Sequence, residues 1–288
     1  MIRPAQERLF GVIGSPVGHS LSPVMMNRAF EVCGLNCRYL AMEVTDLKED
    51  LPILARVGFD GLSVTVPHKE RVMEFIVNVD QEVKVIGAVN TLKRLDEGWE
   101  GRNTDWIGVV RSLETAVSSQ KVEPFPDGFW AGKRALVVGA GGAARAVCYA
   151  LKKMGMKVTV SNRTPGKAEN LCRDFSCNSV PLNELGNFQA GAWDVIIQTT
   201  PVGMTGYDEK SSPVPPALFA PGVVAMDVVY TPRWTVFLRE AKERGATVVF
   251  GLDMLLYQGV AQFEWWFGIP APLEAMRKAL EDAISGTF

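Results

Sequence analysis

ALVVGAGGAAR, at residues 135–145, indicates the architecture of the second half of the chain. Ala135–Val138 has the continuous apolar character of a buried strand, and the glycines after it permit a tight turn into a helix. A second strand is predicted at Lys157–Ser161, followed by Asn162-Arg163-Thr164. Strand, glycine turn, helix and strand in this order are typical of a dinucleotide-binding fold. Because the motif begins in the middle of the chain, a separate unit is predicted ahead of it.

The small residues of this turn have predicted roles beside a bound pyrophosphate. Gly139 allows the bend, Gly141 lets the backbone approach the phosphates, and Ala144 lets the helix pack closely on the sheet. Gly142 and Ala143 open the helix, whose free N–H groups and positive dipole end favour an anion. The alternative interpretation is a glycine turn in an α/β protein that binds no cofactor.

The end of the second strand predicts which dinucleotide binds. An acidic residue at this place would accept a hydrogen bond from the ribose 2′-hydroxyl and would repel a 2′-phosphate. This chain instead has Asn162, Arg163 and Thr164, and a guanidinium can bind a phosphate through paired donors. The sequence therefore predicts NADP rather than NAD as the cofactor.

Length and composition limit the remaining classes of function. The 288 residues allow about two domains, and a net charge of −2 gives no electrostatic signature for nucleic acid or for an anionic membrane surface. The five cysteines form no C-x-x-C pair, so buried, reduced thiols are expected and a zinc site is not. Without a signal segment or a long apolar run, we expect a soluble, cytoplasmic protein.

Apolar periodicity predicts an α/β order of elements along the whole chain. Strands are expected at 8–14, 39–44, 61–66, 194–198, 223–227 and 247–250, helices at 23–33, 47–57, 106–117 and 252–267, and a hairpin within 90–101. The polar stretch 118–133 separates the two parts of the chain. The last helix is apolar on several sides, so we expect it to return to the first domain.

Polar clusters ahead of the glycine turn carry the predicted chemistry of the first unit. Ser20 and Ser22 alternate by two, so in an extended loop both hydroxyls can hold one carboxylate. The alternative is that Ser22, which precedes Pro23, serves as a helix N-cap. Ser63 and Thr65 share one face of a strand, and Lys69 follows a proline-terminated edge, where it is either a proton carrier or a solvated side chain.

Two Asn-Thr pairs flank the predicted hairpin, at Asn90-Thr91 and Asn103-Thr104. They are expected to lie side by side, with Asp105 orienting Lys69, accepting from a substrate hydroxyl or capping the following helix. The two histidines, His19 and His68, lie in the same clusters and are the weaker candidates for a catalytic base.

In this order the motifs resemble the shikimate dehydrogenase family over nearly the whole chain. The residues that carry the resemblance are Ser20-x-Ser22-Pro23, Thr65-x-Pro67-His68-Lys69, Gly87-x-x-Asn90-Thr91, Gly101-x-Asn103-Thr104-Asp105, the glycine turn, Asn162-Arg163-Thr164, Asp227-x-x-Tyr230-x-Pro232 and Gly251-x-x-Met254-x-x-x-Gln258. The resemblance implies a two-domain enzyme that interconverts shikimate and 3-dehydroshikimate with NADP.

The resemblance also implies a role for individual residues. Ser20 and Ser22 would bind the substrate carboxylate, and Lys69 with Asp105 would form the proton-transfer pair. Ring hydroxyls would be bound by Thr65, Asn90 and Gln258, and Ser63 would also contact the substrate. Besides the glycine turn and residues 162–164, the cofactor would contact Thr200, Val202, Met204, Val228, Gly251 and Met254.

The domains implied are a discontinuous α/β substrate domain, 1–105 plus 251–288, and a Rossmann-like NADP-binding domain with a parallel sheet, 106–250. The enzyme would act on a small molecule, without nucleic acid or membrane, as a monomer or homodimer.

Members of the family often have Asn in place of Ser63, and quinate/shikimate relatives resemble this chain there. Broad quinate and shikimate specificity is therefore a second hypothesis, and a non-catalytic ligand sensor is a third. Members also commonly have His-Asn where this chain has Met26-Asn27, a difference expected to concern loop packing.

Overall fold

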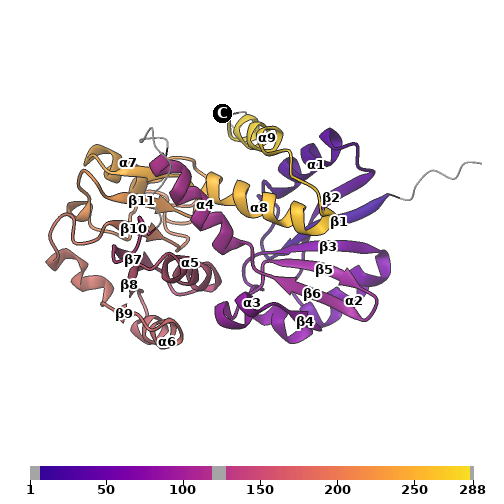
Figure 1. Cartoon of the computed structure of the whole chain (residues 1–288), viewed down its shortest axis with the longest axis horizontal. Helices are drawn as coiled ribbons and strands as arrows, with labels where there is room; N and C mark the ends of the chain where they lie inside the picture. Colours follow the sequence, from indigo (N-terminus) through magenta and orange to yellow (C-terminus); the bar gives the residue numbers. More distant parts are fainter. Residues whose placement is uncertain (1–6, 119–127, 286–288) are drawn as a thin grey trace, which may run out of the picture. The chain divides into compact units, whose positions relative to one another are not determined.

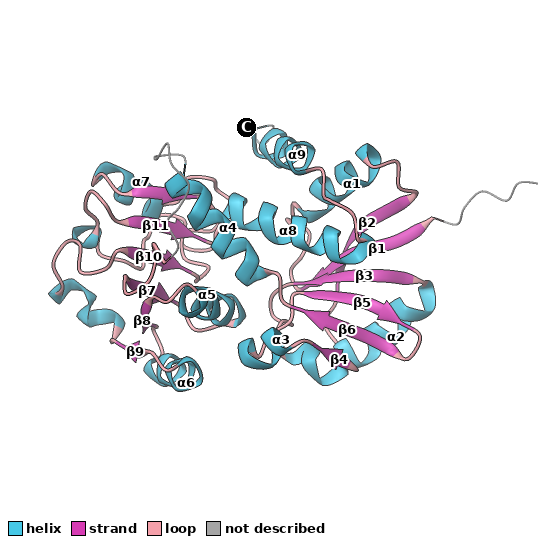
Figure 2. Ribbon diagram, viewed as in Figure 1, coloured by secondary structure: helices cyan, strands magenta, loops and turns pink. Residues whose placement is uncertain are grey.

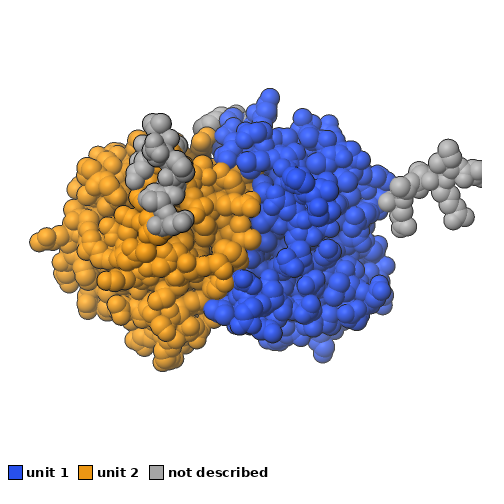
Figure 3. Space-filling model, in the orientation of Figure 1, with its two compact units in different colours: residues 1–104, 258–288 blue, residues 105–257 orange. Residues whose placement is uncertain are grey.

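The computed structural model describes residues 7–118 and 128–285. The chain divides into two compact units, shown in different colours in Figure 3. Unit 1 consists of Met1–Thr104 and Gln258–Phe288, and unit 2 of Asp105–Tyr257.

Unit 1 contains a mixed six-stranded sheet of order β2-β1-β3-β5-β6-β4. Its strands are β1 (Arg8–Gly14), β2 (Cys37–Glu43), β3 (Phe59–Val64), β4 (Asn78–Val79), β5 (Thr91–Leu95) and β6 (Gly98–Arg102). β1 pairs in parallel with β2 and β3, and the predicted hairpin is present as antiparallel β5 and β6. Since β3 and β5 are antiparallel, the end of β3 and the start of β5 meet at one edge of the sheet.

Helices cover both faces of this sheet (Figures 1 and 2). α2 (Leu47–Val57) and α3 (Gln81–Ile86) pack apolar side chains such as Leu51 and Val83 on one face. α2 begins at an Asp46 cap, whose carboxylate accepts from the N–H of Lys48, and ends at Gly58, whose φ of 98° suits glycine. α1 (Ser22–Val32), the part of α8 (Gly251–Phe267) from Gln258 onward and α9 (Leu273–Ser285) belong to the other side, where Phe30 and Trp266 contact the ring of Phe10.

Unit 2 is a doubly wound α/β unit in which all pairings among the described strands are parallel. The sheet order is β12-β11-β10-β7-β8-β9. The strands are β7 (Arg134–Val138), β8 (Lys157–Ser161), β9 (Asn178–Ser179), β10 (Val195–Gln198), β11 (Val224–Asp227) and β12 (Thr247–Val249), and the helices are α4 (Asp105–Ser118), α5 (Gly142–Lys153), α6 (Pro165–Phe175) and α7 (Val236–Glu243). The order in which successive strands are added to the sheet reverses between β7 and β10, and open α/β sheets bind ligands at such a point.

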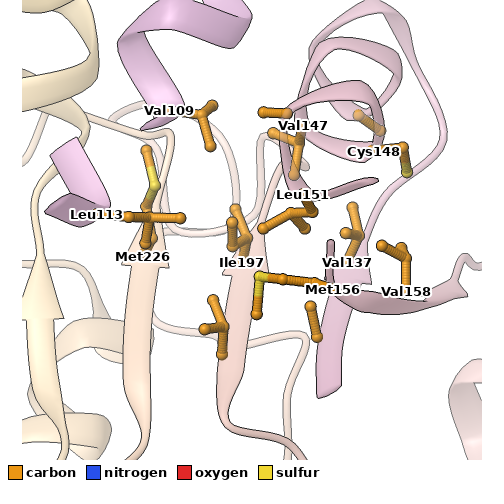
Figure 4. Packing of buried hydrophobic residues seen from close by; sticks show 14 of the residues in the cluster. Val109, Leu113, Val137, Val147, Cys148, Leu151, Met156, Val158, Ile197 and Met226 are labelled. Atoms are coloured by element: carbon orange, nitrogen blue, oxygen red, sulfur yellow. The ribbon is translucent and has the colours of Figure 1, made fainter. Parts of the chain in front are cut away.

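Alternate side chains of the same strands fill two separate cores in unit 2. Val137 and Ile197 face α4 and α5, as Figure 4 shows with Val109, Leu113, Val147 and Leu151. Leu136 and Ile196 face the opposite core, which is closed by Phe237 and Leu238 of α7. This burial on both faces explains why these strands read as continuous apolar runs. Of the predicted linker, residues 119–127 lie outside the described residues.

Candidate functional site

The polar clusters of unit 1 converge on one edge of its sheet. Backbone hydrogen bonds join the loops there: Ser15 N–H donates to the Val66 carbonyl (3.0 Å), Val64 N–H to the Asn90 carbonyl (2.8 Å) and Asn90 N–H to the Arg102 carbonyl (3.1 Å). The segments that follow β1, β3 and β6 are thereby held beside the start of β5. Residues distant in sequence thus share one polar site.

The prediction that Ser22 serves as the N-cap of α1 is wrong. α1 begins at Ser22 itself, Leu21 occupies the cap position, and no side chain caps the helix. Instead the Oγ of Ser20 accepts from the N–H of Ser22 at 3.3 Å. The half-buried Ser20 therefore lies just before α1, the buried Ser22 is its first residue, and the Ser22 hydroxyl does not cap the helix.

Asn90 is the centre of the site and is 2% exposed. Its Oδ1 accepts from the Thr104 N–H at 2.7 Å and from the Thr91 hydroxyl at 2.8 Å. Its Nδ2 donates to Thr104 Oγ1 (3.0 Å) and to Gln258 Oε1 (3.2 Å). The expectation that the two Asn-Thr pairs lie side by side is confirmed. Asn103 supports the arrangement by donating to the Ala88 carbonyl at 2.9 Å.

Three residues of α8 contact three consecutive residues of unit 1. Gln258 accepts from Asn90, Gln262 Nε2 donates to Thr91 Oγ1 (2.9 Å), and Trp266 Nε1 donates to the Leu92 carbonyl (3.0 Å). Their spacing of four places all three on one face of the helix. This stripe fixes the part of α8 that belongs to unit 1 on the sheet.

A second buried chain of hydrogen bonds reaches the site through Tyr39. The Tyr39 hydroxyl donates to Ser63 Oγ at 2.6 Å, and Ser63 Oγ donates to Gln262 Oε1 at 2.7 Å. Burial raises the pKa of the Tyr39 phenol, against the opposing effect of hydrogen bonds with Ser63 and Ser22. Tyr39 therefore stays a neutral donor and connects two of the predicted substrate-binding serines.

Lys69 and Thr65 follow β3 and are half-buried. The Lys69 carbonyl accepts from the N–H of Val89 at 2.7 Å, next to Asn90 in the chain. Asp105, 3% exposed, directly follows Thr104 and is the first residue of α4, so Thr104 rather than Asp105 precedes the helix. The chain thus brings the backbone of both predicted proton carriers to the neighbourhood of Asn90.

The histidines fit supporting roles. His68 is 1% exposed, and its Nε2 lies 2.6 Å from the Val44 carbonyl, so this nitrogen carries the proton and donates. His19 is exposed on the loop before α1. The ranking of both histidines as weaker candidates for a catalytic base stays a prediction.

In unit 2 the predicted cofactor residues follow the carboxyl ends of five parallel strands. Gly139 follows β7 with a φ of 119°, and a Cβ there would lie 2.2 Å from Thr199 Oγ1, so glycine is required. Around Gly141 a Cβ would meet nothing within 4 Å, which leaves open space before the N-terminus of α5. Gly142 and Ala143 form the first turn of α5, and Ala144 is fully buried against the sheet. The turn therefore fits a pyrophosphate.

Asn162, Arg163 and Thr164 follow β8 and precede α6. Asn162 Nδ2 donates to the Thr164 carbonyl at 3.0 Å, while Arg163 and Thr164 are exposed. Thr164 occupies the cap position of α6 without a side-chain cap bond. The guanidinium and the hydroxyl are therefore accessible beside the first turn of a helix.

The buried Gln198 at the end of β10 organises the third loop. Its Nε2 donates to the carbonyls of Thr200 (3.0 Å) and Val202 (2.9 Å), and its Oε1 accepts from the Thr200 N–H. Thr200, Val202 and Met204 are half-buried in this loop.

The last two loops meet at the start of α8. A Cβ on Gly251 would lie 2.5 Å from the Val229 carbonyl oxygen and 2.6 Å from that of Val228. Met254, one turn later, is 6% exposed and packs into the core beside α4.

Three family profiles match the chain. They are described as "Shikimate dehydrogenase substrate binding domain" for residues 12–92, "Shikimate / quinate 5-dehydrogenase" for residues 124–204 and "Shikimate 5'-dehydrogenase C-terminal domain" for residues 251–281. Shikimate dehydrogenase (NADP(+)) of Syntrophobacter fumaroxidans is 44% identical, over 99% of this chain and 97% of that protein. The chain belongs to the shikimate dehydrogenase family.

Solved structures of the family have the same fold. The shikimate 5-dehydrogenase of Thermus thermophilus in complex with NADP(H) and shikimate is 38% identical, with a TM-score of 0.83 over 96% of this chain and 99% of that one. Quinate dehydrogenase of Corynebacterium glutamicum in complex with NAD also has a TM-score of 0.83, over 96% and 100%, at 25% identity. The predicted family, the α/β architecture and the Rossmann-like unit are confirmed.

Sequence reasoning overlooked residues that hold the predicted site residues of this shikimate dehydrogenase family member in place. Tyr39, Gln198 and Gln262 contact the predicted residues but were not predicted themselves, whereas Thr91 was recognised only as a member of an Asn-Thr pair. A usable signal was present in the spacing of Gln258, Gln262 and Trp266, because polar groups at a helical period in an apolar helix require partners. Tyr39 had no comparable signal.

The thiols differ from expectation. Cys148 and Cys172 are buried, but Cys33, Cys37 and Cys177 are half-buried, and all five are free.

Within residues 7–118 and 128–285, no helix has both the length and the apolar character needed to cross a membrane.

Proposed function

We propose that this shikimate dehydrogenase family member oxidises shikimate reversibly to 3-dehydroshikimate with NADP+. The observation that carries the proposal is the buried Asn90 network, which gathers amide and hydroxyl groups at one edge of unit 1. Such groups suit a polyhydroxylated ring. The 44% identity to a shikimate dehydrogenase (NADP(+)) supports the same substrate.

The substrate would be held by groups of two kinds. Ser20 and Ser22 would bind its carboxylate, the Ser22 hydrogen turning from Tyr39 toward the anion. Ser63, Thr65, Asn90 and Gln258 would bind the hydroxyls. This division leaves the carboxylate without a full counter-charge, and two hydroxyl donors suffice to orient it.

Lys69 and Asp105 would together accept the proton of the reacting substrate hydroxyl during oxidation and return it in the reverse reaction. Both follow segments tied to the Asn90 region, and a half-buried lysine has limited contact with water. Asp105 would hold the ammonium in place, and the pair would take up and return the proton as one unit.

The glycine turn would bind the pyrophosphate of NADP+, and Asn162, Arg163 and Thr164 its 2′-phosphate. Thr200, Val202, Met204, Val228, Gly251 and Met254 would line the rest of the cofactor site. When bound, NADP+ supplies a hydride acceptor. Gly251 allows the close backbone approach of α8 to Val228 and Val229 at that site.

The proposal includes the assignment of the units and the setting. Unit 1 would be the substrate domain and unit 2 the NADP domain. The sequence-derived limits at 105 and 251 differ by a few residues from the compact units. Five free thiols support a reducing, cytoplasmic location. A monomer or homodimer acting on a small molecule is proposed.

The test is NADPH formation by purified protein from shikimate, with quinate and NAD+ as parallel arms. We expect rapid turnover with shikimate and NADP+ alone. Comparable rates with quinate or NAD+ would replace this specificity by that of the broad quinate/shikimate relatives. Absence of turnover in every arm, with tight shikimate binding, would identify a sensor.

A further inference from the structure

We infer that Gln262 is a specificity-determining positioning residue, because it holds the Ser63 hydroxyl so that Ser63 can only accept a hydrogen bond from the substrate. The inference rests on the proposed function, since it concerns which group of the substrate meets Ser63. It assigns to this position a substrate group that donates, a hydroxyl, and excludes a carboxylate or any other pure acceptor.

The direction of the network is set by a backbone group that cannot reverse. The Thr104 N–H donates to Asn90 Oδ1, which fixes the orientation of the Asn90 amide. The Thr91 hydroxyl also donates to Asn90 Oδ1 at 2.8 Å, so its hydrogen is committed. Thr91 Oγ1 must therefore accept from any further partner.

This requirement orients Gln262. Its Nε2 donates to Thr91 Oγ1 at 2.9 Å and to the Asn90 carbonyl at 3.3 Å, two acceptors that an amide oxygen could not satisfy. Its Oε1 then faces Ser63. Gln262 is 1% exposed, so water does not compete for these groups.

Ser63 is consequently committed as well. Its single hydrogen goes to Gln262 Oε1 at 2.7 Å, and the Tyr39 hydroxyl occupies one lone pair from 2.6 Å. A serine hydroxyl has one donor and two acceptor sites, so one acceptor site remains. At 6% exposure Ser63 retains a small accessible area, and any substrate group that meets it there must bring its own hydrogen.

The probes are shikimate and its analogues in which fluorine replaces the 4- or the 5-hydroxyl with unchanged configuration. Fluorine cannot donate, so the analogue altered at the Ser63 position loses a hydrogen bond and presents an acceptor to an acceptor. For the wild-type enzyme we expect kcat/KM with that analogue to fall roughly tenfold below the value for shikimate, with the loss mainly in KM.

Three variants separate the specific role from a structural one. Gln262→Met removes the acceptor of the Ser63 hydrogen, so Ser63 can donate to fluorine. The discrimination, meaning the ratio of kcat/KM for shikimate to kcat/KM for the fluorinated analogue, should then shrink to about twofold. Gln262→Glu, with the protonated carboxyl that the facing acceptors Thr91 Oγ1 and the Asn90 carbonyl require, keeps an oxygen facing Ser63 and should retain the discrimination. Ser63→Ala removes the acceptor and should abolish it. The KM for NADP+ and the thermal midpoint serve as controls for folding.

Equal discrimination in the wild type and in Gln262→Met would overturn the inference, as would a wild-type enzyme that uses both analogues as well as shikimate. A uniform rise of KM for all three substrates in Gln262→Met would also overturn it, since that pattern indicates only loosened packing. A wild-type protein that does not oxidise shikimate would instead refute the proposed function, so the two failures are distinct.

Discussion

The side-chain amide of Asn27 pairs with both backbone groups of Tyr39. The Tyr39 N–H donates to Asn27 Oδ1 at 2.8 Å, and Asn27 Nδ2 donates to the Tyr39 carbonyl at 2.9 Å. β2 lies at the edge of its sheet, where backbone groups lack a neighbouring strand, and Asn27 substitutes for one. α1 thereby positions the strand that carries the Tyr39 hydroxyl to Ser63.

Replacing Asn27 should destabilise unit 1 and disturb the site. Asn27→Leu leaves two backbone groups without partners, and we expect a loss of roughly 1–3 kcal/mol in the free energy of unfolding. Urea unfolding measures it, and the KM for shikimate should rise at the same time. Arg28→Ala, which removes only an exposed ion pair with Glu31 on the same helix, is the matched control and should change little.

Lys69→Met should lower kcat by about 10²–10⁴-fold while the Kd for shikimate changes only modestly. The physical reason is that the substitution removes the proton carrier and keeps most of the side-chain volume. Steady-state kinetics with calorimetric binding separates the two effects. If kcat stays within a few-fold of wild type, Lys69 is not the proton carrier.

Arg163→Ala should weaken the binding of NADP+ far more than the binding of NAD+. The guanidinium contacts only the 2′-phosphate in the proposed complex, and a charge-assisted pair of this kind corresponds to roughly a 10- to 100-fold change in Kd. Fluorescence titration with both dinucleotides measures the ratio. Arg173→Ala, at the far end of α6, is the control. Equal weakening of both cofactors in Arg163→Ala would contradict the account of cofactor choice.

Asp227 should make stability depend on pH. Burial raises the pKa of its carboxyl to about 7, against hydrogen bonds from the Thr235 hydroxyl (2.6 Å) and the Val229 N–H (2.9 Å). The unfolded chain releases this proton near pH 4, so between about pH 4 and about pH 7 the native state binds more protons than the unfolded state. This contribution to stability is therefore lost as the pH rises through that window.

Asp227→Asn removes the titrating group, so its unfolding free energy should decline less between those pH values than that of the wild type. Urea unfolding at both ends of the window gives the two slopes. Parallel slopes for the two proteins would show that Asp227 titrates alike in the native and unfolded states.

Cys177 should be the most reactive thiol near neutral pH. Its pKa is lowered to about 7, first by a hydrogen bond from Cys148, then by one from Cys172 and by the charge of Lys152, while burial opposes the change. For Cys37 burial raises the pKa. Alkylation by iodoacetamide, followed by peptide mass spectrometry, should modify Cys177 with a midpoint near pH 7 and Cys37 only at higher pH. Lys152→Met should shift the Cys177 midpoint upward, and an unchanged midpoint would count against the charge effect.

Local sequence predicted the elements of this fold well because the patterns that encode them are local. The turn at Gly139 and the apolar strands of unit 2 needed only neighbouring residues to be recognised. The role of Ser22 differs, since Ser-Pro before a helix is a good cap signal, yet Ser22 is the first residue of α1 and its hydroxyl contacts Tyr39, which is distant in sequence. The partners of Tyr39 and Gln262 could not have been identified, because they lie far away in sequence and meet these side chains only after the sheet forms. The roles of Lys69 and Asp105 stay predictions.

The stripe of Gln258, Gln262 and Trp266 has a consequence for biosynthesis. These residues form hydrogen bonds with Asn90, Thr91 and Leu92 of unit 1, yet they emerge from the ribosome after all of unit 2 has been made. In a nascent chain Asn90 and Thr91 therefore lack their partners from α8 until the whole sequence of the middle unit has been made, although Asn90 can already pair with Thr104. Unit 1 can therefore complete this buried polar network only after the whole sequence of unit 2 has been translated.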